Sequence, residues 1–169
     1  GFIYINKKNR IPPQITGGAQ EREMRGGTEN VIGIVGLTKA LEIAYREMDA
    51  KKAHLENIKG LMIQLLRESI PDVSFNGDAE GNSLYTVLSV SLPPNEASSM
   101  ILFNLDLAGI SASGGSACSS GATGGSHVIN CLYPGTNRTT VRFSFGKQNT
   151  EDDIRFTVNQ LANWYGQKS

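Results

Sequence analysis

Residues 139–161 read TTVRFSFGKQNTEDDIRFTVNQL. In the first seven of these residues apolar and polar side chains alternate, which is the period of a β-strand with one buried face. The apolar side consists of Val141, Phe143 and Phe145. Arg142 lies between them and is expected to point away from the apolar face, where an arginine can clamp a carboxylate with its two-pronged donor group. The alternative is an ion pair between Arg142 and an acidic side chain of the following helix.

The second half of this stretch predicts that helix. Thr150 is followed three residues later by Asp153, an arrangement close to a capping box. The apolar stripe of the helix is Ile154, Val158, Leu161 and Tyr165. Earlier in the chain, helical spacing runs from about residue 28 to residue 69, and Asn95 is a good N-cap for a further helix. Strands are expected in GFIYI (1–5), DVSFNGD (72–78), TVLSVSL (86–92) and GIS (109–111), and a short helix in SHVINCLY (126–133).

The order of these elements predicts an α+β fold, in which a sheet of few strands has helices packed on one side. A length of 169 residues suits one compact domain, or one domain with a piece of a neighbour. Basic and acidic residues both total 16, so neither a nucleic acid nor an anionic membrane is an expected partner. The sequence contains no apolar run near the roughly 20 residues that a spanning helix needs, and no leader, which favours a cytoplasmic protein.

The stretch SASGGSACSSGATGG (111–125) places Cys118 among residues with almost no side chains. A reactive thiolate needs access to its substrate, and small neighbours supply that access. Cys118 is therefore a candidate nucleophile, with an incidental surface thiol as the alternative. Cys131 lies between apolar residues of a predicted helix and is expected to be a small core residue. Both cysteines are expected to be free thiols.

A third candidate is RGGTEN (25–30), in which two glycines and a hydroxyl precede a helix. Backbone N–H groups and the Thr28 hydroxyl can together bind a phosphate there. The alternative is an ordinary turn in which Thr28 or Asn30 caps the helix. His54 and His127 lie too far apart in the sequence to suggest a metal site.

Taken together, GGAQE, RGGTEN, SGGSACSSG, SHV and VRFSFGKQNTEDDI resemble, in this order and at these spacings, the C-terminal part of pyridoxal-phosphate-dependent cysteine desulfurases of the NifS and IscS type, in the aminotransferase class V family. The resemblance runs from Gly1 almost to the end. It implies that residues 1–27 are a strand and loop of the large cofactor-binding domain. Residues 28–169 would then be the small C-terminal domain of a fold-type I pyridoxal 5'-phosphate (PLP) enzyme, carrying the catalytic cysteine.

The resemblance also implies an activity and its residues. Such an enzyme converts L-cysteine to L-alanine and leaves the sulfur as a persulfide on a cysteine, which corresponds to Cys118. The persulfide then passes to scaffold or other acceptor proteins for iron–sulfur cluster assembly or thiolation. By the same resemblance, Arg142 binds the carboxylate of the substrate. Thr28 reaches the PLP phosphate of the partner subunit in a homodimer.

One part of the family pattern is missing. The family attaches PLP to a lysine in a Ser-x-His-Lys segment followed by Gly-Pro-Lys-Gly, and this sequence begins after the corresponding place. The isolated chain is therefore expected to hold no covalently bound cofactor and to lack desulfurase activity. Two alternatives remain: a stand-alone persulfide carrier or interaction module, and a related lyase acting on selenocysteine or cystathionine-like substrates.

Overall fold

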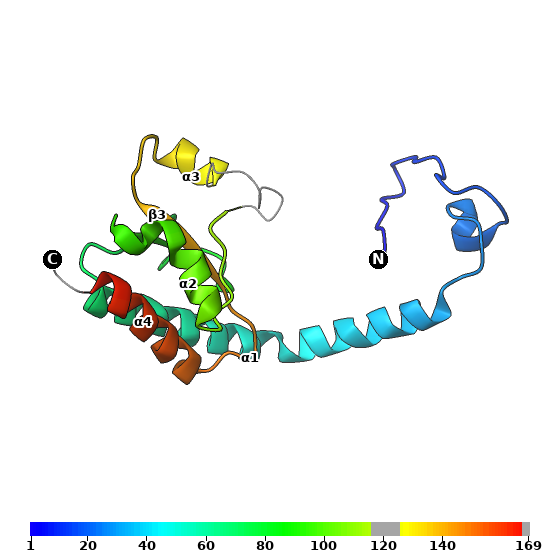
Figure 1. Cartoon of the computed structure of the whole chain (residues 1–169). Helices are drawn as coiled ribbons and strands as arrows, with labels where there is room; N and C mark the ends of the chain where they lie inside the picture. Colours follow the sequence, from blue (N-terminus) through cyan, green and yellow to red (C-terminus); the bar gives the residue numbers. More distant parts are fainter. Residues whose placement is uncertain (116–125, 167–169) are drawn as a thin grey trace. The chain divides into compact units, whose positions relative to one another are not determined.

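The computed structural model describes residues 1–115 and 126–166 (Figure 1). The chain divides into two compact units, Gly1–Asp49 and Ala50–Ser169, and the boundary lies inside helix α1 (Val31–Ser69). The single long helix agrees with the helical spacing of the sequence. The sequence predicts a change of domain at residue 28, and this boundary and the assignment of residues 1–27 to a larger cofactor-binding domain stay predictions.

The second unit is built around an antiparallel sheet with the strand order β1-β2-β3. The strands are β1 (Ser74–Phe75), β2 (Val87–Leu92) and β3 (Thr139–Ser144). In the register of the two longer strands, Val90 faces Val141 and Ser89 faces Arg142. Because side chains alternate along each strand, this register gives the sheet one apolar face and one polar face.

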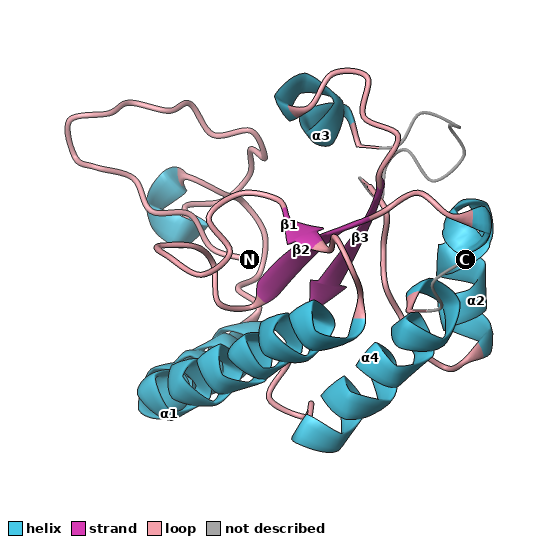
Figure 2. Cartoon of the chain, turned by 90° about the vertical axis from the view of Figure 1, so that its left-hand side faces the viewer, coloured by secondary structure: helices cyan, strands magenta, loops and turns pink. Residues whose placement is uncertain are grey.

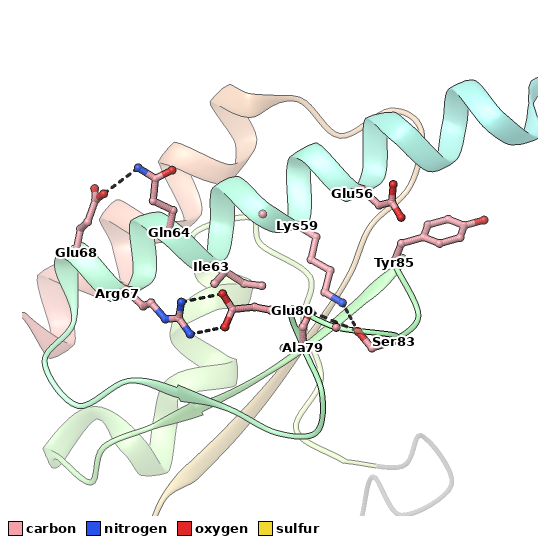
Figure 3. Close-up of a pocket in the computed structure, with 12 residues that line it drawn as sticks. Glu56, Lys59, Ile63, Gln64, Arg67, Glu68, Ala79, Glu80, Ser83 and Tyr85 are labelled. Atoms are coloured by element: carbon pink, nitrogen blue, oxygen red, sulfur yellow. Dashed lines mark hydrogen bonds and ion pairs between the residues drawn. The ribbon is translucent and has the colours of Figure 1, made fainter.

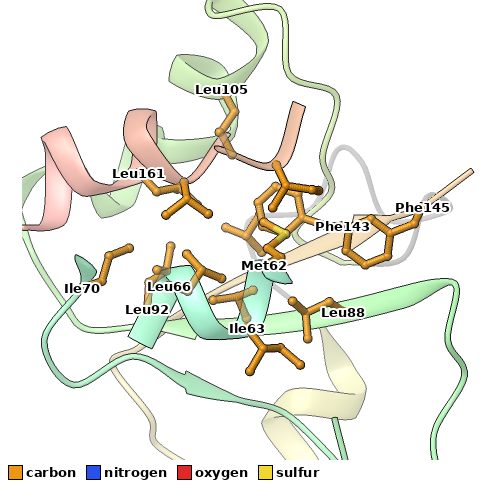
Figure 4. Packing of buried hydrophobic residues seen from close by; sticks show 14 of the residues in the cluster. Met62, Ile63, Leu66, Ile70, Leu88, Leu92, Leu105, Phe143, Phe145 and Leu161 are labelled. Atoms are coloured by element: carbon orange, nitrogen blue, oxygen red, sulfur yellow. The ribbon is translucent and has the colours of Figure 1, made fainter. Parts of the chain in front are cut away.

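Helices cover the apolar face of the sheet, as predicted. Figure 2 shows α4 (Glu151–Tyr165) and α1 lying side by side beneath the sheet. The remaining helical elements are η2 (Glu96–Met100), α2 (Ile101–Leu107) and α3 (His127–Leu132). In Figure 4 the side chains of Leu66, Leu92 and Leu161 point into one interior, and each is fully buried. Full burial of such a side chain stabilises the fold by about 1.5–3 kcal/mol.

The two N-caps that the sequence predicts in this unit are confirmed. The Thr150 hydroxyl accepts from the Asp153 backbone N–H, and the Asp153 carboxylate accepts from the Thr150 N–H. Asn95 caps η2 with a capping box in which Ser98 is the reciprocal partner. These local bonds satisfy backbone N–H groups that have no partner within the helix, and so they fix where each helix starts.

Two predicted strands are wrong. Residues 1–5 form no strand, and the side chains of Phe2, Ile3 and Tyr4 are more than 70% exposed. A strand requires a neighbour that completes its hydrogen bonds, and no other part of the described chain pairs with this segment. The second case is GIS (109–111), which also forms no strand. In the described part of this region, up to residue 115, one bridge is formed, between Ser113 and Arg142.

The unit Gly1–Asp49 consists of an irregular segment and the first part of α1. The segment contains a short 3-10 element, η1 (Gln20–Glu23), and α1 starts where the Asn30 side chain accepts from the Gly33 N–H over 2.9 Å. Asn30 is therefore the cap, one of the two residues that the sequence offers for this role. The apolar side chains of this part of α1, from Val31 to Met48, are exposed except for the half-buried Ile43, whereas the stripe from Leu55 to Leu66 is buried.

Candidate functional site

Arg142 lies on the polar face of the sheet, as the alternation predicts. It is exposed in β3, between the buried side chains of Val141 and Phe143 on the opposite face. Two of the three acidic residues at the start of α4 have other partners, since Glu151 pairs with Arg155 and Asp153 completes the helix cap. Within residues 1–115 and 126–166, no carboxylate forms a salt bridge with Arg142. The guanidinium is thus available to a ligand, and the alternative of an ion pair with the final helix is not what the structure contains.

Hydroxyl and amide groups surround Arg142 on this face. Ser89 is its cross-strand neighbour, and the Asn76 side-chain amide donates to the hydroxyls of Ser89 (3.0 Å) and Thr140 (3.3 Å). Arg138, at the entry to β3, has a different role: its guanidinium donates to the hydroxyl and the carbonyl of Ser91. The two arginines therefore differ, because Arg138 is held by the protein and Arg142 is open to solvent.

A pair of backbone hydrogen bonds joins Arg142 to the start of the cysteine-containing stretch. The Arg142 N–H donates to the Ser113 carbonyl over 2.6 Å, and the Ser113 N–H donates back over 3.1 Å. Next to this pair, a Cβ atom on Gly114 would lie 2.9 Å from a methyl group of Leu102 in α2. Ser113 is thus fixed against β3 five positions before Cys118 in the sequence. This anchor has no signature in the sequence.

Cys118 itself lies outside the described residues, so its role as nucleophile stays a prediction. Cys131 is described, and the expectation of a core residue is wrong: its thiol is free and exposed on α3. The helix is only six residues long and buries none of them, so an apolar neighbourhood in sequence does not produce burial here. Val128, Leu132 and Tyr133 beside it are exposed as well.

The RGGTEN loop offers a phosphate fewer donors than its sequence suggests. The Gly26 N–H donates to the Ile15 carbonyl (2.9 Å), and the Gly27 N–H donates to the side-chain oxygen of Gln20 (3.2 Å). Two of the expected amide donors are therefore used inside the loop. Thr28 follows directly and is exposed, which leaves its hydroxyl as a group that can reach a ligand.

A hollow lined by described residues lies elsewhere. It has a volume of about 630 Å³ and is bounded by α1 and by residues 79–85 (Figure 3). Arg67 on its wall forms a two-pronged ion pair with Glu80, and Lys59 reaches across to the Ser83 hydroxyl (2.8 Å) and the Leu84 carbonyl (3.2 Å). Neither Arg142 nor Thr28 lines it. The hollow is separate from the residues that the sequence selects.

Lys59 is a buried cation that sequence analysis missed. Burial lowers the pKa of its ammonium group, and the carboxylate of Asp78 opposes part of this effect. A signal was present, because Lys59 occupies an inward position of the stripe between Ile58 and Met62. A lysine at such a position must bury its stem and hold its amine in hydrogen bonds, which Ser83 and Leu84 provide.

We expect Lys59 to make the fold more stable as the pH rises. The folded protein loses this proton at a lower pH than the unfolded chain, so unfolding takes up a proton in the interval below the ordinary lysine pKa of 10.5. The free energy of unfolding should therefore gain more between pH 7 and pH 10 in the native sequence than in Lys59→Met. Urea denaturation at the two pH values measures this. Lys52→Met, at an exposed lysine of the same helix, should follow the native curve. Identical pH curves for Lys59→Met and the native protein would contradict the argument.

The described part of the chain contains no group of three or more His, Cys, Asp or Glu side chains arranged to hold a metal ion. None of the described helices carries an apolar run of the length that a bilayer crossing requires.

Comparison with known proteins places the chain in a family. The aminotransferase class-V family matches residues 4–156. The protein named cysteine desulfurase IscS of Dictyoglomus turgidum is 38% identical over 163 residues, covering 95% of this chain and 41% of that protein. The protein of the same name from Clostridium botulinum strain Hall is 38% identical over 170 residues, with 95% and 41% covered. A solved structure titled NifS-like protein has a TM-score of 0.75 and 30% identity, over 95% of this chain and 40% of that one.

The chain belongs to the aminotransferase class-V family. It spans about two fifths of the length of the curated relatives that it matches. Proteins of this family depend on PLP. The described residues fit one part of that cofactor: an exposed hydroxyl at Thr28, on a loop that is already closed by its own amides, can donate a single hydrogen bond to a phosphate oxygen.

Proposed function

We propose that this chain is the C-terminal part of a PLP-dependent cysteine desulfurase, an enzyme that converts L-cysteine to L-alanine and retains the sulfur as a persulfide. The observation that carries the proposal is the state of Arg142. Its guanidinium is exposed on a face rich in hydroxyl groups, while its backbone is bonded to Ser113 at the start of the cysteine-containing stretch. The Arg142 guanidinium, proposed to bind a carboxylate, and the start of the cysteine-containing stretch therefore lie at the same point of the sheet. The names of the relatives support the same reading.

Each residue has a distinct role in this proposal. Arg142 binds the carboxylate of L-cysteine and orients the amino acid. The Cys118 thiolate takes the sulfur atom: the carbon–sulfur bond of the substrate breaks, a sulfur–sulfur bond forms on Cys118, and the carbon skeleton leaves as alanine. PLP, when bound, supplies the electron sink for bond cleavage at the amino acid. Thr28 donates its hydroxyl to the phosphate of PLP and so helps to fix the cofactor.

The partners belong to the proposal as well. A persulfide on Cys118 is a carrier state, and we propose that acceptor or scaffold proteins in the cytoplasm take the sulfur for iron–sulfur cluster assembly or thiolation. We also propose a homodimer. The exposed apolar side chains between Val31 and Met48 support this, because a helix face of this kind in a folded protein is ordinarily covered by further protein.

The test is an assay of the full polypeptide that carries this chain, purified with PLP and given L-cysteine. Alanine and enzyme-bound persulfide should form in equal amounts in a single turnover without a reductant. L-selenocysteine and L-cystathionine serve as competing substrates, and a clear preference for either would favour a related lyase. Persulfide that forms only when another protein donates it would favour a carrier instead.

A further inference from the structure

The segment from Ile15 to Gly27 closes on itself directly before Thr28. Ile15 and Arg25 form a parallel β-bridge, and the Gly26 N–H donates to the Ile15 carbonyl over 2.9 Å. We call this closed segment the Ile15–Gly27 loop. Gly26 is the only buried residue among residues 1–49, all of which the structure describes. Burial in this unit is thus confined to the point where the two ends of the loop meet, which we call the neck of the loop.

Two glycine backbones cross at that neck. A Cβ atom added to Gly26 would lie 2.7 Å from the Cα of Gly17, 2.8 Å from its nitrogen and 2.9 Å from the carbonyl carbon of Thr16. All three are main-chain atoms, which cannot rotate aside as the end of a side chain can. No side chain therefore fits at position 26 while the loop is closed.

A second hydrogen bond that closes the loop lies next to Thr28. The Gly27 N–H donates to the Gln20 side chain, and Gly27 has a φ of 99°, which a residue with a Cβ rarely adopts. On the other side, Asn30 caps α1 through the Gly33 N–H. Thr28 lies between these two fixed points, with only Glu29 separating it from the cap. Its backbone has little freedom as long as the loop is closed.

Closing the loop costs backbone strain. Glu21, Arg22 and Glu23 have φ values of 50°, 59° and 68°, in the left-handed region that residues with side chains disfavour. Three such residues in succession persist only where the surrounding bonds determine the conformation. Here those bonds are the hydrogen bond from the Gly26 N–H to the Ile15 carbonyl and the one from the Gly27 N–H to the Gln20 side chain.

We propose that the Ile15–Gly27 loop is a positioning device for Thr28, in which Gly26 and Gln20 act as positioning residues that hold the hydroxyl toward the phosphate of PLP. This inference rests on the proposed role of Thr28. Because the amides of Gly26 and Gly27 are used to close the loop, the proposed contact with the phosphate relies on the placement of the Thr28 hydroxyl. A shift of the loop therefore acts on the cofactor without changing any residue that touches it.

The first experiment replaces Gly26 with alanine in the full polypeptide that carries this chain. PLP affinity, measured by absorbance titration of the apoprotein, should fall about tenfold or more, the size expected for a lost hydrogen bond to a charged group. Gly60→Ala is the matched control, because the same added methyl group meets no atom within 4 Å in α1 and position 60 lies outside the stretch from Val31 to Met48. It should leave PLP affinity within twofold. Gln20→Ala gives a second, milder variant should Gly26→Ala fail to fold.

The second experiment is a double-mutant cycle with Thr28→Ala. If the loop acts through Thr28, Gly26→Ala or Gln20→Ala should weaken PLP binding in the native background and add less than twofold in the Thr28→Ala background. Amide hydrogen exchange at residues 26–28 should accelerate in both loop variants, which reports on the loop without the cofactor. Additive losses would overturn the positioning role. So would full PLP affinity in both folded loop variants while Thr28→Ala binds weakly. Full affinity in Thr28→Ala would refute the phosphate contact itself, and the positioning role with it.

Discussion

Replacing Cys118 with serine in the full polypeptide is expected to abolish sulfur release from L-cysteine, with turnover lowered by at least about a thousandfold, as is usual when a covalent nucleophile is removed. Serine has nearly the same shape, but its hydroxyl is not ionised at neutral pH and cannot take the sulfur atom. Binding of PLP and of L-cysteine should persist, because these contacts belong to other residues. Alanine formation and cyanide-labile persulfide on the protein measure the two halves of the reaction.

Cys131→Ser is the matched control for this variant. It removes the other thiol of the chain, which is free and exposed on α3. Alanine and persulfide should stay within twofold of the native values. A chain in which Cys131→Ser loses the persulfide while Cys118→Ser retains it would mean that the sulfur acceptor has been assigned to the wrong cysteine. Retention of persulfide in both single variants would remove the covalent step from the proposal.

The elements that the sequence predicted correctly are those with local causes. The Thr150 cap and the stripe that follows it depend on residues within one or two turns of each other, so their pattern in sequence is also their geometry. Asn95 and Ser98 follow the same logic. The face on which Arg142 lies could also be predicted, because the alternation of a strand requires only its immediate neighbours.

The errors concern features that depend on distant partners. GFIYI has strand composition, yet a strand forms only against another strand, and its three large apolar side chains stay exposed. Cys131 has apolar neighbours in sequence, yet α3 buries none of its residues. The helical stripe is the clearest case: the same spacing is exposed from Val31 to Met48 and buried from Leu55 to Leu66. Spacing identifies which face can be buried, and the packing of other elements determines whether it is.

The candidate site also combines features with local causes, which the sequence predicts, and features that depend on distant partners, which it does not. Residue type and local pattern were enough to select Arg142 and Thr28, but not to find what fixes them. The backbone bonds between Ser113 and Arg142 join segments far apart in sequence, and backbone groups carry no sequence signature. The crossing of Gly17 and Gly26 is likewise invisible in RGGTEN, where the glycines suggested open amides rather than a close approach of two chains.

Arg142→Ala should raise the KM for L-cysteine about a hundredfold. A two-pronged guanidinium–carboxylate contact consists of charge-assisted hydrogen bonds, and its loss costs about 3 kcal/mol, which corresponds to a factor of about 100 in affinity. Stability should change little, because the side chain is exposed and its structural hydrogen bonds run through the backbone. The KM of Arg142→Lys should fall between those of Arg142→Ala and the native enzyme, since lysine keeps the charge and loses the planar fork. Steady-state kinetics with L-cysteine and urea denaturation measure these effects.

Arg138→Ala is the contrasting variant, since it removes the same side chain four residues away on the approach to the same strand. The Arg138 guanidinium donates hydrogen bonds to the hydroxyl and the carbonyl of Ser91. Loss of these bonds should lower the free energy of unfolding by about 1–3 kcal/mol. The KM of the folded enzyme should stay within threefold of the native value. The two arginines thus give opposite signatures, one in substrate affinity and one in stability. If Arg142→Ala instead melted early with an unchanged KM, Arg142 would be a structural residue, and the carboxylate of the substrate would have to be bound elsewhere.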